Sequence, residues 1–113
     1  MKYFETRFLE EADKFISKLD PKAAKKVFYN IDIAEQTNDP RLFKKLQNEI
    51  WEFRVVYAGF QIRLLAFWDK TESTQTLVFA THGFIKKEQK ARTGEIERAA
   101  RIRKKYFELK NKK

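Results

Sequence analysis

The chain has 113 residues, of which 36% are charged and 42% are hydrophobic, with no cysteine and one histidine. This length predicts one domain over residues 1–113 that can fold without disulfides. The composition excludes thiolate nucleophiles, cysteine zinc sites and any metal site built on two histidines. No apolar run is long enough to span a membrane and the start of the chain has no signal-peptide core, so we expect a cytoplasmic protein with no membrane partner.

The charge of the chain is strongly uneven. It carries 25 basic and 16 acidic side chains, a formal net charge of +9. Residues 86–113 hold twelve of the basic and four of the acidic ones, and therefore nearly all of the excess. Such asymmetry favours a polyanionic partner, either nucleic acid or an acidic protein surface, although a basic tail without a specific partner has the same composition.

The first part of the chain predicts a helical hairpin. Residues 6–19 carry apolar side chains at the spacing of one face of an amphipathic helix. Asp20-Pro21 ends this helix and begins a second one that runs to about Gln36, because proline fits a first helical turn and Asp20 can act as its N-cap. Residues 41–49 fit either a helical turn or a loop.

The pattern then changes to that of strands. Ile50–Tyr57 and Phe60–Trp68 are rich in aromatic and branched residues, and the two residues between them predict a β-hairpin. Residues 75–81 predict a further antiparallel strand, and residues 94–110 a closing helix. The expected fold is α+β: an N-terminal helical hairpin packed on an antiparallel sheet of about three to four strands, with a C-terminal helix.

A tight turn at Ala58-Gly59 pairs Tyr57 with Phe60 and therefore places Arg54 directly opposite Arg63. One face of the hairpin is then apolar and suited to the helices, with the side chains of Phe53, Val55, Tyr57, Phe60, Ile62 and Leu64. The other face carries Glu52, Arg54, Val56, Gln61, Arg63 and Leu65. Facing like charges destabilise a sheet, so either a carboxylate such as Glu52 relieves them or an anion binds above them. The alternative is two exposed arginines that extend apart into solvent.

A second group of polar residues follows the third strand. Gly83 permits a bend or bulge there, next to His82. Lys86 and Lys87 are adjacent, so in an extended segment only one of them can face the two arginines. A structural histidine and a solvated lysine pair are the simpler interpretations of these residues.

These motifs together resemble one known family. The order is helix, Asp-Pro, helix, then Glu52-Phe53-Arg54, Ile62-Arg63-Leu64, Thr81-His82-Gly83-Phe84, Lys86-Lys87 and a final helix that opens Glu95-Ile96-Glu97. It resembles the RelE/ParE toxin superfamily, and within it the phage-derived HigB-like branch. Thr93-Gly94 departs from the Thr-Pro that many relatives have before the last helix.

The resemblance implies a RelE-like domain and site residues that contact RNA. Arg54 and Arg63 would hold the scissile phosphate, Lys86 or Lys87 would act as general base or further phosphate contact, and His82 would act as an acid. The site uses the 2′-OH of the substrate as nucleophile and needs no metal or cofactor. Neighbouring cations would lower the pKa of a lysine or of His82 in such a cleft. Basic residues beyond the third strand would bind the RNA backbone; these are Lys90, Arg92, Arg101, Lys104 and Lys105.

The resemblance also implies a function: we expect the chain to be the toxin of a type II toxin–antitoxin system, acting as a ribosome-dependent mRNA endonuclease. Its expected partners are a cognate antitoxin, the ribosome and mRNA. An acidic antitoxin segment would neutralise the basic cleft and block substrate. Two alternatives stay open: a ParE-like inhibitor of a protein target such as DNA gyrase, and a non-catalytic basic RNA-binding module.

Overall fold

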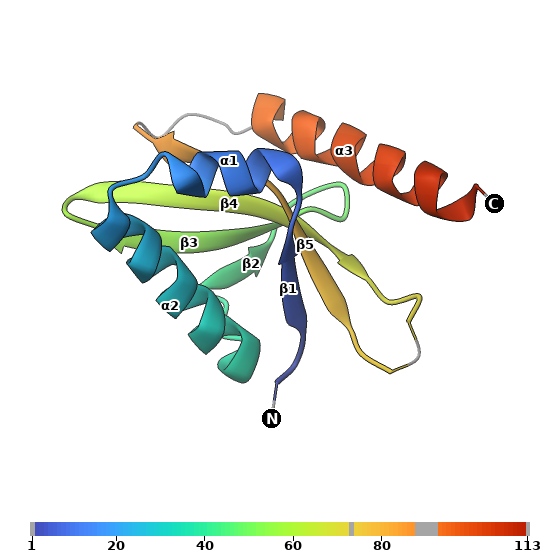
Figure 1. Ribbon diagram of the computed structural model, residues 1–113, viewed down its shortest axis with the longest axis horizontal. Coiled ribbons are helices and arrows are strands. Elements are labelled where there is room, and N and C mark those ends of the chain that lie inside the picture. Colours follow the sequence, from blue (N-terminus) through green and yellow to red (C-terminus); the bar gives the residue numbers. More distant parts are fainter. Residues whose placement is uncertain (1, 73, 88–92, 113) are drawn as a thin grey trace.

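The computed structural model describes residues 2–72, 74–87 and 93–112 (Figure 1). Five strands form one mixed sheet in the order β1-β5-β4-β3-β2, in which β1 and β5 are parallel and the other neighbours are antiparallel. The elements in chain order are β1 (Glu5–Phe8), α1 (Glu10–Ser17), α2 (Pro21–Thr37), β2 (Phe43–Lys45), β3 (Trp51–Tyr57), β4 (Phe60–Asp69), β5 (Leu77–Lys86) and α3 (Thr93–Asn111). The predicted α+β class is confirmed, with more strands than expected.

The helices cover both faces of the sheet. Residues of α1 and α2 form one apolar core with Phe53 and Ile62, and residues of α3 form a second core with Leu65 and Phe67. Alternation along β4 sends successive side chains into the two cores. None of the helices in the described part of the chain is both long and apolar enough to cross a membrane.

The first predicted helix is wrong at its start. Residues 5–8 form β1, in which Thr6 pairs with Val78 of β5, and α1 begins only at Glu10. The sequence spacing over residues 6–9 fits a strand as well as a helix, and pairing with residues 72 positions further along the chain decides between them. Residues 41–49, which were expected to form either a helical turn or a loop, contain the short strand β2, in which Phe43 pairs with Phe53.

The second helix and the hairpin are confirmed. The Asp20 side chain accepts a hydrogen bond from the Lys22 amide at 3.4 Å, as an N-cap does. Ala58 and Gly59 both have positive φ, 51° and 81°, as a two-residue hairpin turn of the favoured type requires. Tyr57 pairs with Phe60, and the register predicted for the whole hairpin follows.

The strand β5 runs to Lys86, well beyond the predicted end at Thr81. Its irregularity lies at Thr81, since Leu65 pairs with His82 and Ala66 with Ala80. Gly83 has a different role from the predicted bend: a Cβ there would lie 2.3 Å from a ring carbon of Phe15. The glycine thus permits α1 to pack directly on β5.

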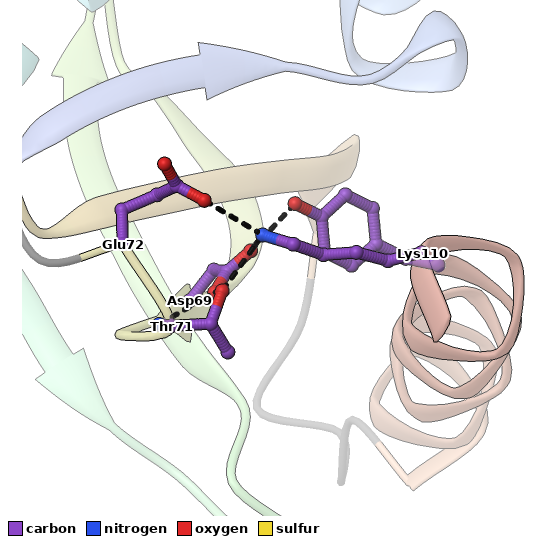
Figure 2. Close-up of polar contacts among 5 residues, drawn as sticks. Asp69, Thr71, Glu72 and Lys110 are labelled. Atoms are coloured by element: carbon purple, nitrogen blue, oxygen red, sulfur yellow. Dashed lines mark hydrogen bonds and ion pairs between the residues drawn. The ribbon is translucent and has the colours of Figure 1, made fainter. Parts of the chain in front are cut away.

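A buried carboxylate anchors the C-terminal half of α3 to the end of β4. Asp69 is fully buried and accepts hydrogen bonds from the Tyr106 hydroxyl at 2.6 Å and from Lys110 Nζ at 2.7 Å. Figure 2 shows the Lys110 side chain reaching Asp69, Thr71 and Glu72. Burial opposes ionisation of Asp69, but these donors together hold its pKa well below the usual value. Burial and the bond to Asp69 raise the pKa of Tyr106 to about 12.

Candidate functional site

Three cations lie on one face of the sheet, which we call the basic face and define by Glu52, Arg54, Gln61, Arg63 and Lys86. Arg54 of β3 pairs with Arg63 of β4, and Gln61 of β4 pairs with Lys86 of β5. Cross-strand partners share a face, and residues two apart on one strand share it too. The register therefore brings Arg54, Arg63 and Lys86 together at the hairpin end of the sheet, away from α1 and α2.

Both arginines share one carboxylate. Glu52 Oε1 lies 3.6 Å from Arg54 Nε and 3.7 Å from Arg63 Nε, and the Glu52 side chain has no exposed surface. One buried negative charge therefore compensates two guanidinium groups that face each other. This arrangement explains how the sheet tolerates the like-charged pair, and the three side chains together keep a net positive charge.

The two guanidinium groups differ in exposure. The Arg63 side chain is only 4% exposed, and it donates hydrogen bonds to Gln61 Oε1 at 2.8 Å and to the Ile62 carbonyl at 3.2 Å. The Arg54 side chain is 34% exposed. Arg54 is the guanidinium that an anion from solvent can reach, whereas Arg63 beside it is enclosed.

The two candidate lysines are placed differently. Lys86 is the last residue of β5 and lies on the basic face, where it is half-buried, while Lys87 follows the strand and is exposed. Only one of the adjacent pair thus belongs to the basic face, as the alternation of a strand requires.

His82 lies on the same face as Leu65 and Arg63 but is buried, with 1% exposure. Its Nδ1 is 3.0 Å from Thr81 Oγ1, and its Nε2 is 2.9 Å from Glu95 Oε1. Burial lowers the pKa of His82, the bond to Glu95 opposes this, and the charge of Arg98 adds to the lowering. The pKa of His82 is therefore lowered, as expected, but burial rather than a nearby cation is the first cause. Nε2–H of the neutral ring would donate to Glu95, which ties β5 to the start of α3.

Three of the residues expected to bind the RNA backbone belong to α3. Arg101, Lys104 and Lys105 are exposed on α3. Lys90 and Arg92, which were also expected to bind RNA, lie outside the described residues. Within the ranges that the structure describes, no cluster of three histidine, aspartate or glutamate side chains could hold a metal ion.

Sequence reasoning missed two partners of these site residues. Gln61 lies two positions from Arg63 on the same strand, so the predicted register contained the signal for their contact. Glu95 is separated from His82 by thirteen residues and a connection between elements, and no local pattern pairs them.

A family model described as "Phage derived protein Gp49-like (DUF891)" matches residues 14–104 of the chain. No curated protein sequence matches this chain.

Two solved structures have a similar fold. One is the toxin–antitoxin complex RelBE2 from Mycobacterium tuberculosis, with a TM-score of 0.58 and 20% identity over 76% of this chain and 100% of that chain. The other is the E. coli toxin RelE in the free state, as a mutant with two arginines changed to alanine; its TM-score is 0.61, with 19% identity over 91% of this chain and 98% of that chain. The expected RelE-like fold is confirmed by these similarities.

Proposed function

This chain belongs to the phage-derived Gp49-like family, and from that membership, its RelE fold and its basic face we propose that it is the toxin of a type II toxin–antitoxin system. Its proposed activity is metal-independent cleavage of mRNA on the ribosome. The observation that carries the proposal is the facing pair Arg54 and Arg63, which share one buried carboxylate and have Lys86 beside them.

The charge of the basic face suits a phosphodiester. Glu52 compensates only one of the two guanidinium groups, so an anion above Arg54 would complete the balance. A guanidinium donates two parallel hydrogen bonds to phosphate oxygens and stays protonated at every physiological pH. Because Arg63 is held by Gln61 and Glu52, Arg54 is the direct phosphate contact and Arg63 supports it from the neighbouring strand.

The proposed reaction is a transesterification followed by product release. The 2′-oxygen of the substrate attacks the adjacent phosphorus, a P–O2′ bond forms, and the P–O5′ bond breaks to leave a 2′,3′-cyclic phosphate. Lys86, in its neutral form, accepts the 2′-OH proton as general base, and the leaving 5′-oxygen takes a proton from solvent. Arg54 stabilises the negative charge that develops on the phosphorane oxygens. His82, buried with both ring nitrogens engaged, is a positioning residue in this scheme.

An antitoxin is the proposed protein partner. The similar RelBE2 toxin was solved as a toxin–antitoxin complex. An acidic antitoxin segment that covers the basic face would be attracted by its net positive charge and would exclude substrate.

Arg54→Ala and Lys86→Ala test the nuclease assignment. We expect each to lose at least about a hundredfold in cleavage of translated mRNA, measured by primer extension, because oxyanion-type contacts and general bases contribute on this scale. Arg7→Ala is the matched control, since Arg7 is half-exposed on β1 at the edge of the sheet, 3.7 Å from the Glu5 carboxylate and 3.3 Å from the Thr6 carbonyl to which it donates. It should cleave like the wild type.

The outcome also separates the alternatives. Growth arrest that persists in a folded Arg54→Ala/Lys86→Ala variant without cleavage would contradict the nuclease and favour a protein target such as gyrase. Absence of both cleavage and growth arrest in the wild type would favour the non-catalytic RNA-binding module.

A further inference from the structure

A second cationic site lies at the opposite end of the sheet from the hairpin turn. A cleft of about 630 Å³ is formed there by the end of β2 and the loop after it, the start of β3, the end of β4 and the C-terminal half of α3. We call it the aromatic cleft and define it by three aromatic and three basic residues: Trp51, Trp68, Phe107, Lys45, Lys70 and Arg103.

The aromatic cleft is separate from the basic face. Trp68 lies five residues along β4 from Arg63, about 17 Å at a rise of about 3.3 Å per residue. Trp51 and Trp68 pack against the core that α1 and α2 cover, whereas Arg54 and Arg63 point to the other side of the sheet. No residue belongs to both sites.

The cations of the cleft are arranged over ring faces. Lys70 Nζ lies 5.0 Å from the Trp68 ring centre, and Arg103 Cζ lies 5.2 Å from that of Phe107. In the part of the chain that the structure describes, Lys70 and Arg103 form no ion pair, while Lys45 is 3.7 Å from Glu49. Glu49 also lines the cleft, where it is paired with Lys45, so Lys70 and Arg103 leave a net positive charge beside partly exposed aromatic rings.

This combination fits the two halves of a nucleotide. Aromatic side chains stack on nucleobases with little sequence preference, and lysine and arginine bind the phosphate backbone. The volume is in the range of sites that hold one small molecule. An acidic peptide would satisfy the cations but would leave the ring faces without a flat partner.

We propose that the aromatic cleft binds one nucleotide, with its base against the indole rings and its phosphate between Lys70 and Arg103. The choice of RNA as the source of that nucleotide rests on the proposed function, because an RNA that reaches the basic face could extend to this second contact. A free mononucleotide presents the same base and phosphate. An RNA strand differs from it because the neighbouring nucleotides of the strand would also contact the protein.

The two tryptophans of the chain both line this cleft, so intrinsic fluorescence reports on it directly. The titration uses the Arg54→Ala protein, which should not cleave the probe, with hexauridylate and uridine 5′-monophosphate as probes at low salt. We expect saturable quenching of tryptophan emission by at least one probe. Tighter binding of the hexamer identifies a strand, and equal affinity identifies a free nucleotide; both support the site.

Paired variants locate the response. Lys70→Ala/Arg103→Ala should raise the dissociation constant at least about tenfold with unchanged circular dichroism. The matched control Arg7→Ala/Lys26→Ala removes the same two charges elsewhere, including a lysine 5.9 Å from the Tyr29 ring, and should bind like its parent. If neither probe quenches the emission, or if both double variants weaken binding equally, the proposed site is wrong. Neither result bears on cleavage of mRNA by the unmodified protein, which tests the proposed function separately.

Discussion

Replacing Glu52 with glutamine would leave Arg54 and Arg63 facing each other without the carboxylate between them. The change keeps the size of the side chain and removes one buried charge. At 3.7 Å and an effective dielectric constant of about 20, attraction to Arg63 alone is about 4 kcal/mol, before the desolvation that opposes it. Removing one partner of a buried ion pair costs about 3–5 kcal/mol, because the other charge stays buried. We therefore expect the free energy of unfolding to fall by about 3 kcal/mol or more.

Glu49→Gln is the matched control. Glu49 also lies 3.7 Å from a cation, Lys45, but its side chain is 65% exposed, so the same substitution should cost less than about 1 kcal/mol. Urea unfolding followed by circular dichroism measures both, and the melting temperature of Glu52→Gln should fall by about 12 °C or more. Adding Arg63→Met should recover part of the loss, since it removes a buried positive charge that Glu52 compensates. Equal effects of Glu52→Gln and Glu49→Gln would refute the reasoning that burial makes the shared carboxylate essential.

Three further predictions concern the packing and the buried polar groups. Gly83→Ala should destabilise the fold by about 1–3 kcal/mol in urea unfolding, because its methyl group would overlap the Phe15 ring, whereas Gly94→Ala, with nothing within 4 Å, should not; equal effects would contradict the packing argument. Tyr106→Phe should cost about 1.5–3 kcal/mol, since it removes a donor to a buried carboxylate, and a loss below about 0.5 kcal/mol would show that the contact contributes little. Because the pKa of His82 is lowered in the folded state, the unfolded chain binds the extra proton first, and stability should fall as pH drops below about 6.5. His82→Gln should lack this loss of stability below pH 6.5, and an unchanged slope would assign it to other groups.

Local patterns were sufficient where the physical cause is itself local. Asp20-Pro21 places an N-cap and a first helical turn side by side, and the structure has both. The two-residue turn at Ala58-Gly59 determines the pairing of every residue in the hairpin, so the sequence alone predicts Arg54 opposite Arg63, as the structure has them. A carboxylate such as Glu52 was one of the alternatives that the facing charges left open, and Glu52 lies 3.6 and 3.7 Å from the two arginines.

What depended on distant partners could not be read from the pattern of residues along the chain. Residues 5–8 are a strand because β5 lies beside them, and Gly83 is required because Phe15 approaches from another element. Exposure is likewise a property of the packed molecule: Arg54 reaches solvent while Arg63, of identical chemistry, is enclosed. The aromatic cleft joins residues from β2, β3, β4 and α3. Only the packing of these elements places both tryptophans, Lys70 and Arg103 around one cleft.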